Sequence, residues 1–148
     1  LNNKTDELND TVTGVGFGVS GIASDPESVH PLSKKIGGQN IIDKIGGYKD
    51  SATNLQGLLI ADFDHPIQGK KCNQMGSTSV LPLEYTVGGG DSGSGAFRKK
   101  NGVWQLVGIC SGADINFKLI TKYGYYGTVM NWTRVSLYHK WITDNMQH

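Results

Sequence analysis

The chain has 148 residues, the size of one domain, and combines 37% hydrophobic residues with 21 glycines, which argues against a helical bundle. Lys and Arg total 14 while Asp and Glu total 13, without a long block of like charge, so nothing indicates a nucleic acid or an anionic membrane as partner. No apolar run is long enough to span a membrane, and the polar first residues are unlike a signal peptide.

In chain order, the polar residues 1–10 are predicted to form a solvated linker. Strand-forming residues alternate with glycines over Thr11–Ile22, which predicts a strand that enters a tight turn. Prolines and glycines interrupt Ala23–Asp50, which is therefore interpreted as a loop. Five further short strands are predicted, at Leu55–Ala61, Ser79–Tyr85, Gly95–Arg98, Trp104–Ile109 and Thr128–Val135.

Only the end of the chain has a helical pattern. Within Ser136–Met146, Ser136 is placed to cap a helix whose apolar residues recur at helical spacing, namely Leu137, Trp141 and Ile142. Short strands at this spacing, followed by one helix, favour an antiparallel barrel or sandwich. The three tryptophans are expected in its core: Trp104, Trp132 and Trp141.

Residues 88–97 read GGGDSGSGAF and carry the strongest chemical signal. A serine bracketed by glycines suits a tight turn that exposes its hydroxyl and lets main-chain N–H groups converge beside it. Such a turn suits a nucleophile with an oxyanion hole, in which each donor contributes about 3–4 kcal/mol in the transition state. A flexible glycine turn with an exposed serine is the simpler alternative. Asp91 should need a buried cationic partner, because an unpaired buried carboxylate is costly.

This segment resembles the Gly-Asp-Ser-Gly-Gly motif of the trypsin-like (chymotrypsin-fold) serine peptidases, in particular their bacterial secreted members. Similar segments flank it: VTGVG at 12–16, KIGGQNIID at 35–43, LLIADFDHP at 58–66, LVGICSG at 106–112 and WTRVSLYHKWI at 132–142. The resemblance implies the second barrel alone of a two-barrel fold. Residues 11–148 would form a six-stranded antiparallel Greek-key barrel closed by a C-terminal α-helix, after an inter-barrel linker at residues 1–10.

The resemblance further implies a secreted serine endopeptidase that works through an acyl-enzyme. Ser92 matches the nucleophile, and the amides of Gly90 and Ser92 match the oxyanion hole. Asp91 matches the carboxylate that pairs with a newly cut N-terminal amine in activated relatives. The catalytic His and Asp would come from an N-terminal barrel, as a separate chain or a removed segment, and no cofactor or metal is implied. The partner would be a protein or peptide substrate.

Six residues match substrate-binding positions of the family. Three belong to the primary specificity pocket: Thr86, Val87 and Met130. The other three match the strand edge that pairs with the extended substrate: Ser111, Gly112 and Ala113. Because the family's pocket carboxylate is replaced by Thr86, we expect cleavage after uncharged residues of small to medium size. If the insertion after residue 113 folds Asp114 into the pocket, we would instead expect a preference for cleavage after Lys or Arg.

Several other residues have open or simpler interpretations. The four histidines are read as surface residues: His30, His65, His139 and His148. Asp62 and Asp64 resemble a weak site for a hard cation, but a turn stabilised by aspartates is preferred. Cys72 and Cys110 either form one disulfide or lie as two buried thiols. The alternative to an enzyme is a non-catalytic binding or regulatory module derived from the same fold.

Overall fold

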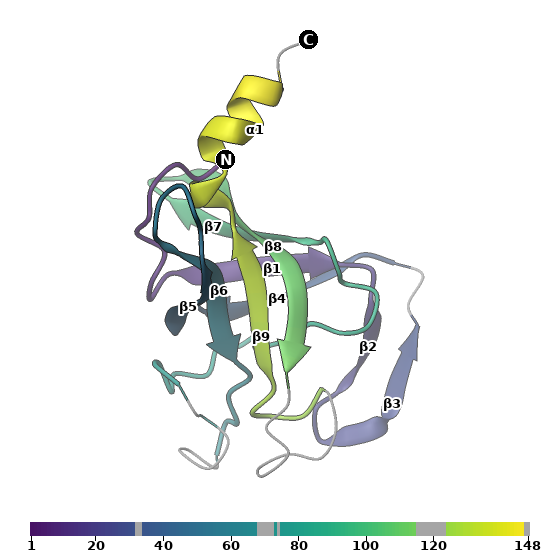
Figure 1. Ribbon diagram of the computed structural model, residues 1–148. Helices are drawn as coiled ribbons and strands as arrows, with labels where there is room; N and C mark the ends of the chain where they lie inside the picture. Colours follow the sequence, from purple (N-terminus) through teal and green to yellow (C-terminus); the bar gives the residue numbers. More distant parts are fainter. Residues whose placement is uncertain (32–33, 68–72, 74, 115–123, 147–148) are drawn as a thin grey trace.

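A computed structural model describes residues 1–31, 34–67, 73, 75–114 and 124–146. Most of these residues belong to an antiparallel sheet of seven strands in the order β4-β1-β7-β8-β9-β6-β5 (Figure 1). Its strands are β1 (Thr11–Gly16), β4 (Ile36–Ile41), β5 (Lys44–Lys49), β6 (Gln56–Asp62), β7 (Gly95–Lys100), β8 (Val103–Asp114) and β9 (Val129–Arg134). A separate hairpin consists of β2 (Val19–Ile22) and β3 (Asp25–Pro31). The predicted β class is confirmed.

The sheet curls because its two outermost strands are consecutive in the chain. β4 and β5 lie at opposite ends of the strand order, yet only Ile42 and Asp43 separate them. The amide of Ile42 donates to the carbonyl of Asp10 (3.0 Å), and that of Asp43 donates to the carbonyl of Ile60 (3.0 Å). The main-chain ladder does not join β4 to β5, so the described residues form a curled seven-stranded sheet and not a closed six-stranded barrel.

One loop prediction and one strand prediction were wrong. The segment Ala23–Asp50, interpreted as a loop, contains β3, β4 and β5. Its glycines mark close approaches within strands: a Cβ at Gly38 would lie 2.5 Å from the Cβ of Tyr85. The strand predicted over Ser79–Tyr85 is instead an irregular segment, which contributes one isolated bridge between Gln39 and Glu84.

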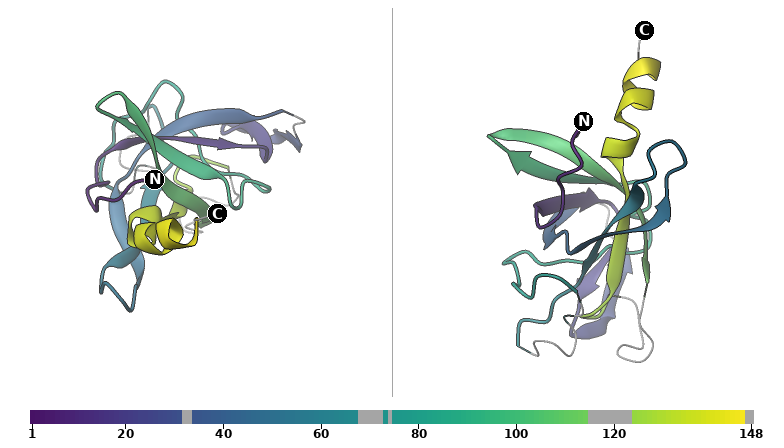
Figure 2. Two further views of the ribbon diagram at one scale, coloured as in Figure 1. Left: turned by 90° about the horizontal axis from the view of Figure 1, so that it is seen from above. Right: turned by 60° about the vertical axis from the view of Figure 1, so that its left-hand side comes forward.

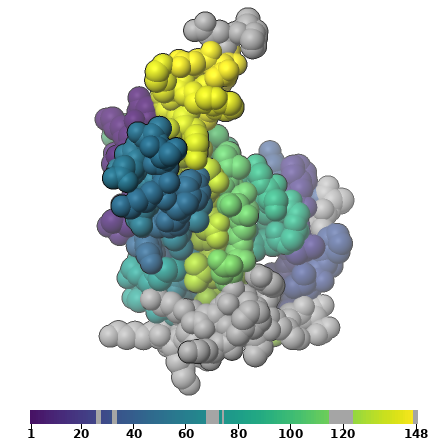
Figure 3. Space-filling view, in the orientation of Figure 1, coloured from purple at the N-terminus to yellow at the C-terminus, as the bar shows by residue number. Residues whose placement is uncertain are grey.

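The C-terminal helix begins later than predicted and does not close the sheet. A 3-10 turn, η2 (Val135–Leu137), precedes the helix α1 (His139–Asn145), so Ser136 is not its cap. Helix α1 has no buried residue and stands away from the sheet (Figures 1, 2 and 3). No helix in the described part of the chain combines the length and apolarity that crossing a membrane requires.

The hydrophobic core lies within the curl of the sheet. Its fully buried members are Val12, Ile42, Leu59, Ala61, Ala96, Val107, Met130 and Trp132. A Cβ at Gly108 would lie 2.7 Å from the Cβ of Trp132, so the glycine makes room for the indole. Only Trp132 matches the core prediction for tryptophan, because Trp104 and Trp141 are 56% and 67% exposed.

The first residues are docked on the sheet through Asn2 and Glu7, which are buried contrary to expectation, while most of the others are exposed. Glu7 is fully buried, and its Oε2 accepts hydrogen bonds from Nε (3.1 Å) and Nη2 (2.6 Å) of Arg134 on β9. Asn2, also fully buried, donates to Oε1 of Glu7 at 2.8 Å. The buried carboxylate therefore has both a counter-charge and hydrogen bonds.

A second arginine, Arg98 on β7, anchors the same segment. Its side chain is 2% exposed and forms ion pairs with Asp6 (2.8 Å) and Asp10. It also donates to Oδ1 of Asn2 at 2.8 Å. A hydrogen bond from Lys100, together with the charge of Arg98, lowers the pKa of Asp6 to about 2. Residues 1–10 thus pack as part of the domain, while their role as an inter-barrel linker stays a prediction.

Replacing Glu7 by Gln should show how much this docking contributes. Arg134 would stay buried without its carboxylate, which should lower the free energy of unfolding by about 3–5 kcal/mol. Urea denaturation would measure the change. Lys100→Gln is the matched control: it removes a half-exposed ion pair to Asp6 and should cost less than about 1 kcal/mol. Equal losses in the two variants would contradict the buried pairing.

Candidate functional site

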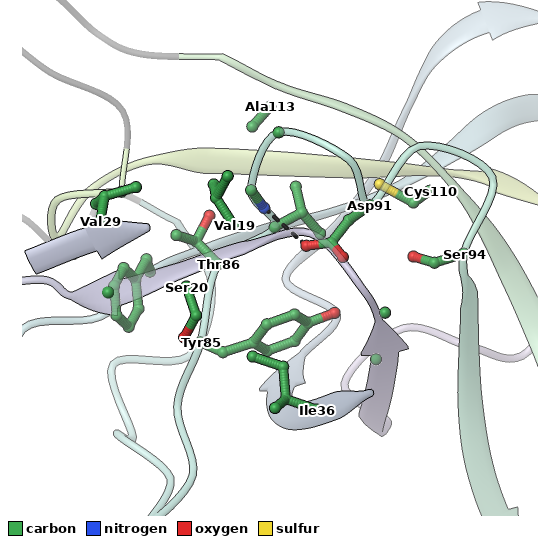
Figure 4. Close-up of a pocket in the computed structure, with 18 of the residues that line it drawn as sticks. Val19, Ser20, Val29, Ile36, Tyr85, Thr86, Asp91, Ser94, Cys110 and Ala113 are labelled. Atoms are coloured by element: carbon green, nitrogen blue, oxygen red, sulfur yellow. Dashed lines mark hydrogen bonds between the residues drawn. The ribbon is translucent and has the colours of Figure 1, made fainter. Parts of the chain in front are cut away.

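A cavity of about 460 Å³ opens beside the glycine-rich segment (Figure 4). The hairpin β2–β3, the start of β4, residues 84–89 and the end of β8 line it. Its walls are largely apolar, with contributions from Val19, Ile22, Val29, Ile36, Phe63 and Tyr85. A concave apolar site with a few polar groups is the usual form of a binding pocket.

Ser92 stands at the tip of a tight turn and borders this cavity. The turn is held by main-chain hydrogen bonds from Asp91 to Gly88 (3.1 Å) and from Ser94 to Asp91 (2.9 Å). Gly90 and Gly93 have φ values of +96° and +81°, a region that glycine adopts without strain. The glycine-dependent turn expected from the sequence is therefore present, and the side chain of Ser92 is exposed.

The amides of Gly90 and Ser92, on either side of Asp91, are not used within the turn. Those of Asp91 and Gly93 donate to the carbonyls of Gly88 (3.1 Å) and Cys110 (3.0 Å). Those of Gly90 and Ser92 donate to no acceptor among the residues described. These two amides match the oxyanion hole of the family that the sequence resembles, and that role stays a prediction.

Asp91 is satisfied by main-chain amides. Its Oδ1 accepts from the amide of Gly18 (2.8 Å), and its Oδ2 accepts from that of Gly88 (2.9 Å). Cβ atoms at Gly16 and Gly18 would come within 2.0 and 2.6 Å of this carboxylate, so both glycines make room for it. The expected cationic partner is replaced by two neutral donors, which tie the turn to the segment before β2.

The cavity brings together several predicted site residues. Besides Asp91 and Ser92, its lining includes Thr86, Val87, Gly112 and Ala113. The Oγ1 atom of Thr86 is buried without a protein hydrogen-bond partner among the residues described. Among the described residues, Asp91 and Glu84 are the carboxyl-bearing ones that line the cavity, and Glu84 was not anticipated from sequence. Glu84 accepts a hydrogen bond from the amide of Leu81 at 2.8 Å.

Other predicted residues lie elsewhere. Met130 is fully buried in the core, paired with Ala61 across the sheet, and does not line the cavity. Ser111 is exposed at a bulge where β8 pairs with β9. Asp114 is exposed and paired with Val129, so it does not enter the cavity.

The end of β8 has one open edge. β7 pairs with β8 as far as the Gly95–Ile109 pair, whereas β9 continues along it to Asp114. In the described structure, residues 111–113 therefore pair on one side only, next to the cavity. An open edge of this kind accepts an added strand through main-chain hydrogen bonds.

No described histidine contacts Ser92. His30 is exposed and interacts with the carbonyl of Ser28, and the ring of His65 packs on Tyr126 with centroids 4.5 Å apart. His139 begins helix α1, and His148 lies outside the described residues. Cys110 is a buried free thiol whose pKa is raised by burial, and Cys72 lies outside the described residues.

Carboxyl groups also gather where segment 75–85 meets Asp43 and the end of β6. The expectation of a turn at Asp62 and Asp64 was wrong, because Asp62 ends strand β6 and Asp64 follows it outside any turn; both are buried. Burial raises the pKa of both Asp43 and Asp64 to about 7, and that of Glu84 upward. No group of three ligating side chains in the described structure is arranged to hold a metal ion. Asp43 and Glu84 lie far from Asp62 in sequence, so no motif could reveal this cluster.

No protein-family model matches the chain, and no curated protein is significantly similar to it. The likeness to trypsin-like peptidases therefore stays an expectation from the segments quoted from the sequence.

Gly18→Ala should weaken the turn. The new Cβ would displace the Asp91 carboxylate from its two amides, which should lower the free energy of unfolding by about 2 kcal/mol. Gly89→Ala is the matched control, because nothing lies within 4 Å of a Cβ there, and it should cost less than about 0.5 kcal/mol. Thermal and urea unfolding would measure both. If Gly18→Ala were as stable as Gly89→Ala, Asp91 would not hold the turn in solution.

Proposed function

We propose that the protein is a serine endopeptidase that hydrolyses peptide bonds through an acyl-enzyme, with Ser92 as the nucleophile. One observation carries the proposal. The exposed hydroxyl of Ser92 borders a cavity, and the amides of Gly90 and Ser92 are not used within the described structure. A nucleophile beside two uncommitted donors is the arrangement that acyl transfer requires.

The finer architecture belongs to the same proposal. We infer that the curled sheet is the second barrel of a two-barrel chymotrypsin-like fold, entered from the first barrel through residues 1–10. The two-residue link between the outermost strands supports a barrel-like arrangement of the sheet. Like the bacterial peptidases that it resembles, the protein would act outside the cell.

In the proposed reaction, Oγ of Ser92 attacks the scissile carbonyl while a histidine takes its proton. The amides of Gly90 and Ser92 stabilise the oxyanion, and the histidine returns the proton to the leaving amine. Water then hydrolyses the acyl ester by the same route. Since no described histidine contacts Ser92, the base and its orienting aspartate would belong to an N-terminal half, present as a separate chain or a removed segment.

The open edge of β8 and the cavity suit an extended peptide. Main-chain groups of residues 111–113 would pair with the substrate, and one substrate side chain would enter the cavity. Thr86 offers a buried hydroxyl in its wall, whereas Asp91 is committed to two amides. Burial raises the pKa of Glu84, the other carboxyl residue in the lining, which favours its uncharged form. These features support a preference for uncharged residues.

A fluorophosphonate probe tests the nucleophile. With the His- and Asp-bearing half present, the probe should label Ser92, and Ser92→Ala should lower peptidase activity on the order of 10⁴-fold or more. The chain alone should show no activity because no described histidine contacts Ser92. Ser94→Ala is the matched control and should still be labelled. Undiminished labelling of Ser92→Ala would disprove the assignment.

Cleavage of a mixed peptide library tests the specificity. We expect cuts after uncharged side chains of small to medium size, with Lys and Arg disfavoured, because neither Thr86 nor Val87 neutralises a cation. The position of each cut, read by mass spectrometry, measures this. A dominant Lys or Arg preference that disappears in Glu84→Gln would show that Glu84 forms the pocket floor, contrary to the proposal.

The alternative is a non-catalytic binding module that uses the same cavity and strand edge. The lack of a described histidine at Ser92 favours it. The enzyme would be favoured instead if a His and an Asp were found in the upstream sequence, or in a co-purifying chain of about the size of one barrel.

A further inference from the structure

The hairpin formed by β7 and β8 reaches beyond the neighbouring strands of the sheet (Figure 2). β1 pairs with β7 only as far as Phe97, and β9 pairs with β8 only from Gly108 onward. In the described structure, residues 98–100 and 103–105 therefore pair with each other and with no third strand. The outer half of the hairpin projects from the sheet.

A two-residue turn closes this hairpin. Asn101 and Gly102 have φ values of +51° and +80°, and positive φ at both loop residues is typical of the tight type I′ turn. Because a paired strand lies on each side of the turn, the side chains next to it are held in fixed directions. Residues 99–104, which we call the tip, form a preformed projection.

Each face of the tip carries a lysine and an exposed apolar side chain. Residues opposite one another in an antiparallel pair share a face, and successive residues of a strand alternate between faces. Lys99 and Trp104 therefore share one face, where the ammonium nitrogen lies 5.9 Å from the centre of the indole ring. Lys100 and Val103 share the other face. Val103 and Trp104 are 61% and 56% exposed, so both faces leave apolar surface in water.

The tip is also positively charged. Its only ionisable side chains are the two lysines. Lys100 forms a half-exposed ion pair with Asp6 (2.8 Å), whereas Lys99 is exposed and forms no ion pair within the described structure. The nearly balanced charge of the whole chain hides this local excess, which is why the sequence gave no indication of an anionic partner.

We propose that the tip of the β7–β8 hairpin docks on the surface of an anionic lipid bilayer. Val103 and Trp104 enter the interfacial layer, which favours indole rings, while Lys99 and Lys100 contact the anionic headgroups. A protein groove, a sugar or a nucleic acid that packs on one face of the tip would leave the apolar side chain of the other face in water. A lipid interface surrounds the tip and covers both faces, so the two-sided exposure favours it.

Docking through the tip would leave the cavity accessible. The cavity is lined by Gly112 and Ala113 at the end of β8, whereas Val103 begins the same strand. At about 3.3 Å per residue, up to about 30 Å of strand separates the two places. The inference therefore does not depend on what the cavity binds or on the proposed role of Ser92.

Co-sedimentation of the 148-residue chain with vesicles tests the docking. At about 0.1 M salt, phosphatidylcholine vesicles with about 30% phosphatidylglycerol should bind the chain about tenfold or more tightly than vesicles of phosphatidylcholine alone. Trp104→Ala should weaken binding to the anionic vesicles about tenfold, and Lys99→Gln about fivefold. No binding of the unmodified chain to the anionic vesicles would overturn the proposal.

Helix α1 offers matched controls for both variants. Trp141 is 67% exposed, and the side chain of Lys140 is 87% exposed. Trp141→Ala and Lys140→Gln therefore remove the same side chains from another exposed place and should leave vesicle binding unchanged. Losses equal to those of Trp104→Ala and Lys99→Gln would overturn the assignment to the tip.

Fluorescence shows whether the tip enters the interface. In Trp141→Phe, vesicles should shift the emission to the blue, and lipids brominated in the upper acyl chain should quench it, because Trp104 is then the exposed indole. Trp104→Phe should show neither effect. Equal quenching in both variants would overturn the proposal. So would binding of heparin or duplex DNA, without binding of vesicles, that Lys99→Gln abolishes, since the partner would then be a soluble polyanion.

Discussion

The two-residue link between β4 and β5 is the constraint on which the rest of the structure depends. These strands are the two edges of the sheet, so a short link forces the sheet to curl and to enclose its own core. The curl brings Asp43 of the link against the end of β6. β4 pairs antiparallel with β1, so the start of β4 lies beside the end of β1, where one end of the cavity lies.

Glycines that let a distant side chain approach the backbone closely also shape the structure. Gly38 makes room for Tyr85, and Gly16 and Gly18 make room for the carboxylate of Asp91. In each place a glycine inside or beside a strand admits a polar or aromatic side chain from a distant segment. The cavity wall and the Ser92 turn are thus positioned by glycines that lie far from them in sequence.

The β class and the glycine turn around Ser92 could be predicted from the sequence. Alternating β-branched residues revealed the β class, and the glycines around Ser92 revealed a turn, because both signals are local. Strand β4 was missed since its glycines read as loop residues, although they serve packing against Tyr85. The docking of residues 1–10 was missed because its counter-charges, Arg98 and Arg134, come from distant strands. The acidic cluster was hidden for the same reason.

The uneven burial of the tryptophans gives the molecule an internal optical reporter. Trp132 is fully buried in the sheet, whereas Trp104 on β8 and Trp141 on helix α1 are largely exposed. A collisional quencher such as iodide, which stays in water, would suppress the emission of the two exposed indoles first. The remaining blue-shifted fluorescence then comes from Trp132 alone and follows the state of the core independently of helix α1.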